Sequence, residues 1–165
     1  MFIHEMFQQK PCVFSVEVFP PKKAGAAEET LYPVLRELCT LGPDYISVTY
    51  GAGGGTAGQS TAKIASYIKN GLHVEALAHL TCVNSTRVQV EETLTRLRED
   101  NVENVLALRG DINPDLPRRM DFLHASDLAK AIAQTGGFGV AGACYPEGHL
   151  ESPSLQADVE SLRYK

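Results

Sequence analysis

Short apolar runs alternate along the chain with segments in which apolar residues recur at helical intervals. The apolar runs are rich in β-branched and aliphatic residues. Their nearly continuous hydrophobicity is typical of strands that are covered on both faces, as in a parallel sheet. They predict five strands, at residues 12–19, 45–49, 74–80, 104–108 and 138–144.

The segments between and after these strands predict five helices, at residues 28–41, 60–70, 86–100, 126–134 and 155–164. Thr86 and Gln89 form a capping-box pattern at the start of the third helix, and Pro33 fits the first helix only within its first turn. The order β-α, repeated five times without a linker, predicts a single domain over residues 1–165 with a parallel α/β fold. The alternation alone fits an open doubly wound sheet or part of a (β/α)8 barrel, which needs about 250 residues when complete.

Composition and charge exclude several classes of protein. The chain of 165 residues carries 15 basic and 20 acidic side chains, a net charge of −5, and no run of Lys and Arg longer than two, which argues against binding to nucleic acid. No apolar stretch of about 18 residues could span a membrane, and the segment MFIHEMFQQK is too polar for a signal peptide. The four cysteines form no C-x-x-C pair, so we expect reduced, mostly buried thiols and a cytoplasmic location.

A glycine-rich segment follows the second predicted strand. Its Gly53-x-Gly55-x-x-Gly58 spacing fits a dinucleotide fingerprint, but the acid that should end the next strand is missing, because Glu75 lies at the start of that strand. The same segment nearly matches a P-loop, with Gln59 in place of the lysine that phosphates require. A loop that lets a ligand approach the backbone is the favoured interpretation.

Polar residues occur at or just after the end of each predicted strand. Because the carboxyl ends of parallel strands share one rim, where ligands bind, we expect these residues to face one site. No His, Cys or carboxylate cluster has metal-ligand spacing, and no metal is expected. No serine or cysteine has the context of a nucleophile. The rim residues are Glu17, Ser47, Thr49, Tyr50, His79, Thr81, Arg109, Gly110, Asp111, Tyr145, Glu147 and His149.

Glu17 is the most informative of these residues, because it interrupts an otherwise apolar strand. It could form a structural ion pair with Arg109 or Lys22. Alternatively it could be an acid in a dry site, able to transfer a proton near neutral pH. A buried carboxylate without a function is costly, so the second interpretation is favoured. Arg109 and Asp111 could equally form a surface turn with a local salt bridge, and His79 alone is more typical of a core histidine.

Six segments in one order resemble the bacterial, flavin-dependent methylenetetrahydrofolate reductase family. They are FSVEVFPPK at 14–22, ISVTYGA at 46–52, HLTC at 79–82, NVLALRGD at 104–111, ASDL at 125–128 and YPEGH at 145–149. The resemblance implies a (β/α)8 TIM barrel that holds FAD at the carboxyl ends of its strands. This chain would carry five of the βα units, with the C-terminal units absent.

The resemblance also implies an activity. NADH or NADPH would reduce FAD by hydride transfer, and 5,10-methylenetetrahydrofolate would then take the hydride to become 5-methyltetrahydrofolate, in one-carbon metabolism and methionine supply. Glu17 would be the general acid that opens the methylene bridge, and Asp111 the carboxylate that stabilises the developing positive charge. Thr49 would lie near the nicotinamide. The positions that would line FAD are Tyr50, Ala52, His79, Arg109, Gly110, Asp111, Ala125, Tyr145, His149, Asp158 and Lys165.

Two departures from the family pattern change the expectations. His124 replaces the tyrosine expected beside the flavin, and the sequence stops in its fifth helix. Five strands alone leave sheet edges exposed, so we expect a homo-oligomer and weak or absent turnover for the isolated chain. The alternatives are a non-catalytic flavin- or pterin-binding half-barrel that needs a partner or self-association, and an open NAD-binding domain.

Overall fold

The computed structural model describes residues 1–23, 25–50, 57–112 and 119–165. Its strands are β1 (Ser15–Val18), β2 (Tyr45–Val48), β3 (Glu75–Thr81), β4 (Asn104–Leu108) and β5 (Gly139–Gly142). Its α-helices are α1 (Ile3–Gln9), α2 (Tyr32–Cys39), α3 (Ala57–Ser66), α4 (Arg87–Glu99), α5 (Ala125–Thr135) and α6 (Leu155–Leu162). Two π-helical turns, η1 (Ala27–Leu31) and η3 (Tyr67–Gly71), precede α2 and follow α3.

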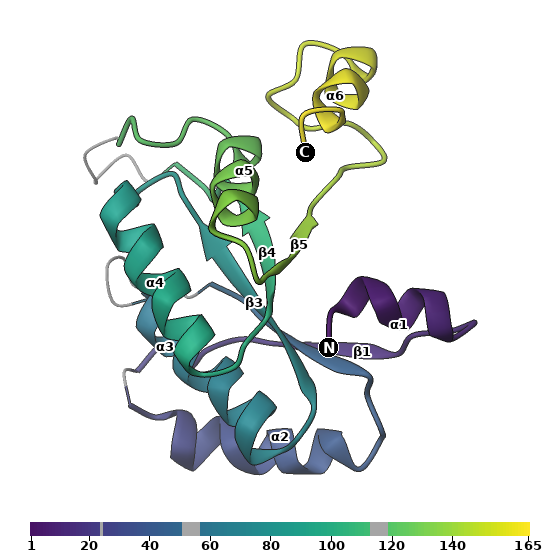
Figure 1. Cartoon of the computed structure of the whole chain (residues 1–165), viewed down its shortest axis with the longest axis vertical. Coiled ribbons are helices and arrows are strands. Elements are labelled where there is room, and N and C mark those ends of the chain that lie inside the picture. Colours follow the sequence, from purple (N-terminus) through teal and green to yellow (C-terminus); the bar gives the residue numbers. More distant parts are fainter. Residues whose placement is uncertain (24, 51–56, 113–118) are drawn as a thin grey trace.

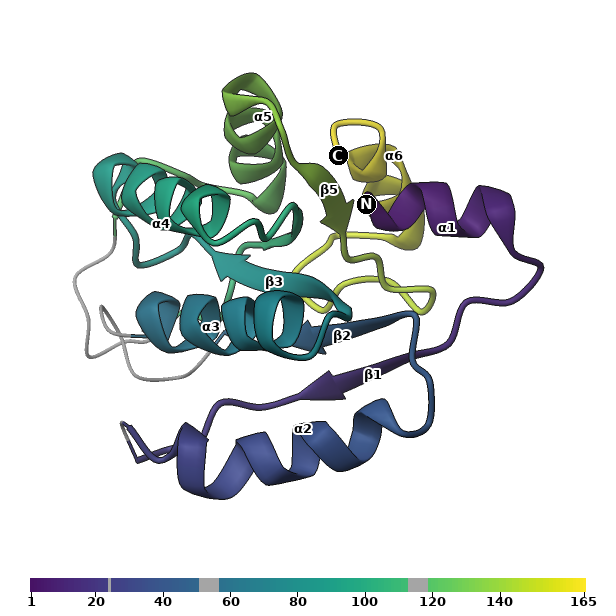
Figure 2. The same cartoon turned by 60° about the horizontal axis from the view of Figure 1, so that its bottom comes forward.

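All five strands are parallel and lie in the order β1-β2-β3-β4-β5. This consecutive order is that of a singly wound barrel wall, whereas a doubly wound nucleotide-binding sheet reverses direction at a switch point. The open doubly wound alternative is therefore wrong. Helices α2, α3, α4 and α5 lie along one side of the curved sheet, and α1 and α6 lie on the other (Figure 2). The five strands and five helices predicted from the sequence are confirmed as part of a TIM-type barrel.

The hydrophobic core lies between the sheet and its layer of helices. Ile46 and Val48 alternate with Ser47 on β2, so they point toward the helices while Ser47 points to the other face. Each covering helix contributes fully buried side chains to this layer. They are Leu35 of α2, Ile64 of α3, Val90, Leu94 and Leu97 of α4, and Leu128 and Ile132 of α5.

The N-terminal helix α1 was not among the predicted elements. It lies at the amino ends of the strands, opposite α6 (Figure 1), where the side chain of Asn104 fixes it. The Asn104 amide accepts a hydrogen bond from the backbone N–H of Ile3 at 2.9 Å and donates one to the carbonyl of Met1 at 3.1 Å. Gly139 leaves room for this contact, because a Cβ there would lie 2.8 Å from Asn104 Oδ1. Such contacts across a hundred residues leave no local pattern in the sequence.

Three further expectations can be compared with the structure. Pro33 lies in the first turn of α2, as its position required. The cysteines are free thiols, but the expectation that most are buried is wrong, since Cys12 and Cys144 are exposed and Cys39 is half-buried. Within the described residues, no helix combines the length and the hydropathy that a membrane span requires.

Candidate functional site

A cleft of about 980 Å³ lies at the carboxyl ends of the strands, bordered by the start of α3 and by α4 as far as Arg96. Figure 1 shows this end of the sheet, where β3, β4 and β5 point toward the level of α6. Ten of the predicted site residues line the cleft, although they come from six separate segments of the chain. They are Thr49, Tyr50, His79, Arg109, Gly110, Asp111, Ala125, Tyr145, His149 and Lys165.

Three predicted residues are not among those that line the cleft in the described structure: Asp158, Ala52 and Glu17. Asp158 is not part of the cleft wall; its carboxylate accepts a hydrogen bond from the backbone N–H of His149 at 3.0 Å and so anchors the loop before α6. Ala52 lies outside the described residues, as does most of the glycine-rich segment that contains Gly53 and Gly55. Glu17 is the third residue of β1 and is not among the residues that line the cleft.

Glu17 forms a polar cluster with Ser47 and His79. Its Oε2 atom lies 3.4 Å from Nε2 of His79 and 3.5 Å from Oγ of Ser47. Ser47 Oγ and His79 Nε2 are 2.7 Å apart. The expectation of a dry carboxylate is wrong for this structure, since the Glu17 side chain is 48% exposed. Its neighbours are instead the buried members of the cluster.

Burial controls the charge of His79. Removal from water lowers the pKa of its imidazole below the ordinary value of 6.5, and the nearby Glu17 carboxylate opposes this shift only partly. The ring is therefore neutral at neutral pH, with one nitrogen that donates and one that accepts. Ser47 is one of the rim residues predicted from the sequence, but no catalytic or cofactor-binding role was predicted for it. The signal for it is its position directly beside Glu17 in the register of β1 and β2.

Arg109 provides a fixed cation at the end of β4. Its guanidinium donates two hydrogen bonds to the carboxylate of Glu151, at 2.6 and 2.7 Å, and this pairing raises the pKa of Arg109. Arg109 thus pairs with Glu151, and in the described structure it forms no ion pair with Glu17. A second cation lies nearby on the same rim, because Lys165 lines the cleft and donates to the carbonyl of Ala143 at 2.9 Å.

Gly110 brings the backbone close to the next strand. It has a φ of +83°, and a Cβ there would lie 3.0 Å from Cβ of Thr81. The preceding carbonyl, that of Arg109, accepts hydrogen bonds from the N–H groups of Cys82 and Val83. Only glycine adopts this positive φ and tolerates this close approach to Thr81 without strain. The turn after β4 therefore exposes its backbone to the cleft.

His124, the departure from the family pattern, is the exposed N-cap residue of α5. The Asp127 carboxylate accepts hydrogen bonds from the N–H groups of Leu123 and His124, at 3.0 and 2.9 Å. These bonds fix the start of α5, and the next residue, Ala125, reaches the cleft. Within the described ranges, no three His, Cys, Asp or Glu side chains gather closely enough to hold a metal ion.

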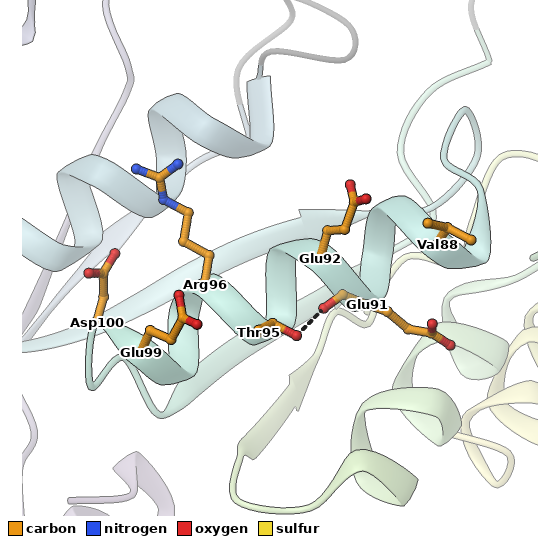
Figure 3. Close-up of a pocket in the computed structure, with 7 residues that line it drawn as sticks. All are labelled: Val88, Glu91, Glu92, Thr95, Arg96, Glu99 and Asp100. Atoms are coloured by element: carbon orange, nitrogen blue, oxygen red, sulfur yellow. Dashed lines mark hydrogen bonds between the residues drawn. The ribbon is translucent and has the colours of Figure 1, made fainter.

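A second hollow, of about 540 Å³, lies on the outer face of α4 (Figure 3). Its walls come from this one helix and its C-cap, and its hydroxyl group, on Thr95, already donates to the carbonyl of Glu91 at 2.8 Å. The lining is dominated by solvated charges and brings no groups from different elements together. The lining residues are Val88, Glu91, Glu92, Thr95, Arg96, Glu99 and Asp100. The cleft at the strand ends is therefore the candidate functional site.

Comparison with known proteins gives one consistent result. The profile of the family described as methylenetetrahydrofolate reductase matches residues 2–165. The 5,10-methylenetetrahydrofolate reductase of Pectobacterium carotovorum is 38% identical over 151 residues, which cover 92% of this chain and 49% of that protein. The corresponding protein of Escherichia coli K12 is 34% identical, with 92% and 50% covered. Methylenetetrahydrofolate reductase (NADH) 1 of Arabidopsis thaliana is 35% identical, with 99% and 30% covered. The chain thus spans about half the length of its bacterial relatives.

Proposed function

The chain belongs to the methylenetetrahydrofolate reductase family, and from this premise we propose that it forms the flavin-binding and proton-donating part of such a reductase. The reaction would be the reduction of 5,10-methylenetetrahydrofolate to 5-methyltetrahydrofolate by NADH or NADPH, with FAD as the cofactor. The observation that carries the proposal is the convergence of ten expected cofactor and substrate residues on one cleft.

The cleft suits a dinucleotide cofactor in size and in chemistry. Its volume of about 980 Å³ is at the upper end of the range for ligand sites. Arg109 and Lys165 offer two cations for a diphosphate, and Gly110 lets the cofactor approach the backbone. Tyr50 offers an aromatic face, and burial raises the pKa of its phenol, which therefore stays neutral. FAD, when bound, would supply the hydride-accepting and hydride-donating chemistry.

Glu17 would donate the proton that the reaction consumes. Opening the methylene bridge requires a proton on the nitrogen that leaves the methylene carbon. That carbon stays bound to the second nitrogen as an iminium cation. Hydride then adds to that carbon to form the methyl group, so one proton and one hydride enter per turnover. Asp111 would stabilise the cation, because a fixed carboxylate at the rim needs no reorganisation when positive charge develops. Thr49, at the end of β2, would lie near the nicotinamide.

Retention of FAD is the first test of this proposal. The purified chain is mixed with excess FAD, passed through gel filtration, and its visible spectrum is recorded together with far-UV circular dichroism. We expect flavin to elute with the folded protein, and NADH or NADPH to bleach it without oxygen. Folded protein that retains no flavin would contradict the proposal that these five units form the cofactor site.

Glu17→Gln separates the two half-reactions in FAD-loaded protein. We expect reduction of flavin by NADH to persist, while reoxidation by 5,10-methylenetetrahydrofolate falls by about 10²–10⁴-fold, the usual contribution of general acid catalysis. Single-turnover absorbance measurements follow both steps. Equal loss of both would contradict the proposed role and favour a structural Glu17.

A second candidate function follows from the sheet edges. Among the described residues, β1 and β5 each pair with a single neighbour, and the chain spans only half of the bacterial relatives. We therefore retain a flavin- or pterin-binding half-barrel that needs a partner or self-association for turnover. Bound flavin that NADH and NADPH both fail to reduce would favour this alternative.

A further inference from the structure

We propose that Ser47 and His79 form a hydrogen-bond relay that orients Glu17 and couples its protonation to the tautomer of the His79 imidazole. Both are positioning residues in this proposal, since they act on the proton through Glu17. The effect of the relay on catalysis rests on the proposed role of Glu17 as the proton donor. Its geometry and its first test are independent of that role.

Strand register brings the three side chains to one face of the sheet. Glu17 is the partner of Ser47 between β1 and β2, and Ser47 is the partner of Leu77 between β2 and β3. His79 lies two residues beyond Leu77, so alternation returns its side chain to the same face. That face is the one turned away from α2, α3 and α4, since Ile46 and Val48 point toward these helices. Three neighbouring strands therefore contribute one residue each.

The cluster runs from a buried end to an exposed end. His79 and Ser47 are 8% and 6% exposed, whereas the Glu17 side chain is 48% exposed. Buried polar groups need hydrogen-bond partners, and the 2.7 Å contact between Ser47 Oγ and His79 Nε2 satisfies both. The contacts of Glu17 with these two are longer, 3.5 and 3.4 Å. Long hydrogen bonds around a catalytic group are common before ligands bind and tighten in the complex.

The serine hydroxyl can both donate and accept, so the relay has two directions. When Glu17 is ionised, His79 Nε2–H donates to Ser47 Oγ and the Ser47 hydroxyl donates to Glu17 Oε2. When Glu17 is protonated, its O–H donates to Ser47 Oγ and the Ser47 hydroxyl donates to a bare His79 Nε2, with the ring hydrogen on Nδ1. Protonation of Glu17 thus requires the tautomer of His79 to change.

The relay also offers a route for reloading Glu17 after it has given up its proton. The Ser47 hydroxyl proton moves to Glu17 Oε2, the Nε2 proton of His79 moves to Ser47, and Nδ1 takes a proton from solvent. One proton enters and Glu17 gains one, so the charges balance. Because burial lowers the pKa of His79, the ring stays neutral and available for this exchange. Glu17 is the charged group that acts on this ring in the described part of the chain.

Nitrogen-15 NMR of the histidine side chains tests the relay in protein without any ligand. In the wild type, where Glu17 Oε2 accepts from the Ser47 hydroxyl, we expect the His79 hydrogen on Nε2. Glu17→Gln would keep a carbonyl that can accept from Ser47, so the test uses Glu17→Leu, which removes this acceptor. The Ser47 hydroxyl then donates to His79 Nε2, and we expect the ring hydrogen to move to Nδ1. Glu17 is half-exposed, so this variant is expected to fold. The same tautomer in both proteins would overturn the proposal.

Ser47→Ala removes the link between the two ends. In this background, Glu17→Leu is expected to leave the His79 tautomer unchanged. Ser15→Ala is the matched control, because it removes a hydroxyl from the same face of β1, two residues before Glu17, and the tautomer should still respond to Glu17→Leu. Coupling that survives Ser47→Ala would contradict the relay.

Kinetics of FAD-loaded protein then separate the relay from the proposed function. We expect Ser47→Ala to slow the folate half-reaction about tenfold and to shift its pH profile, while flavin reduction by NADH is unchanged. If the tautomer responds but Glu17→Gln leaves the folate step intact, the proposed function fails and the relay stands. If Glu17→Gln abolishes the folate step but the tautomer does not respond, the relay fails alone.

Discussion

The cysteines of this chain differ widely in how far they are exposed to solvent. Cys12 and Cys144 are exposed, whereas burial raises the pKa of the Cys82 thiol to about 11. Its Sγ lies 3.7 Å from the carbonyl of His124, to which it donates. The sequence shows no difference between these cysteines that would predict this, because burial depends on which strand end faces which helix.

Thiol labelling should therefore be selective. At about pH 8, the thiolate fraction of Cys82 is on the order of 10⁻³ because its pKa is shifted, and access is blocked as well. We expect maleimide to modify Cys12 and Cys144 rapidly in native protein, with Cys82 modified only after denaturation. Peptide mass spectrometry after timed quenching measures this. Rapid native labelling of Cys82 would contradict the burial described here.

His79 should make stability depend on pH. Its pKa is lower when folded than its ordinary value of 6.5, so the unfolded chain binds its proton more readily. The stabilisation linked to neutral His79 is complete above that ordinary value and is lost as the pH falls toward the lower folded pKa. We expect the free energy of unfolding of the wild type to fall on acidification relative to His79→Gln. Urea titrations at several pH values test this, and parallel pH profiles for the two proteins would exclude it.

At the scale of elements, α4 was predicted closely because its start is encoded locally. Thr86 Oγ1 accepts a hydrogen bond from the Gln89 backbone N–H at 3.2 Å, and Gln89 Oε1 accepts one from the Thr86 N–H at 2.9 Å. The capping box seen in the sequence is therefore confirmed. The helix also carries its buried residues, Val90, Leu94 and Leu97, at the expected intervals.

Removing this cap should weaken the protein measurably. We expect Thr86→Ala to lower the free energy of unfolding by about 1 kcal/mol, since N-cap threonines contribute on this scale. Thr95→Ala is the matched control on the same helix; its exposed hydroxyl bonds to the helix backbone, and alanine has the higher helix propensity, so no loss is expected. Urea unfolding followed by circular dichroism measures both. An equal loss in both variants would contradict the capping role.

Helix α1 depends on one distant side chain. Asn104 is 1% exposed and holds the backbone of Met1 and Ile3. We expect Asn104→Ala to lower the free energy of unfolding by about 1–3 kcal/mol, because two partly buried hydrogen bonds are lost, and to expose α1 to proteases. Asn70→Ala, which removes an exposed bond to the Asp100 carbonyl, should change both readouts much less. Unchanged proteolysis at α1 in Asn104→Ala would contradict this anchoring.

At the scale of the whole molecule, the sheet has two edges. Each of the outer strands, β1 and β5, pairs on one side within the described structure, and Val140 on β5 is 40% exposed. Open edges of this kind promote association between chains. The homo-oligomer expected from the sequence stays a prediction, and these edge strands are where the structure allows chains to pair.

A charge on the β5 edge should reduce this association. We expect Val140→Lys to weaken self-association about tenfold, or about 1.4 kcal/mol, because a lysine at an edge strand opposes further pairing. Val88→Lys, an equally drastic change at an exposed position on α4, is the control and should have little effect. Sedimentation velocity over a range of concentrations measures both. Association that is unaffected by Val140→Lys would place the contact elsewhere.

The sequence by itself determined the repeated β-α order, the approximate position of each strand and covering helix, and most of the rim residues. These features follow from local periodicity, capping signals and the polar residues that end apolar strands. Tertiary structure decided the consecutive strand order, the docking of α1, and the partners of Glu17 and Arg109. Ser47 lies 30 residues from Glu17, and Glu151 lies 42 residues from Arg109. Such pairs depend on strand register and loop path, because hydrogen bonds and burial are set by neighbours in space.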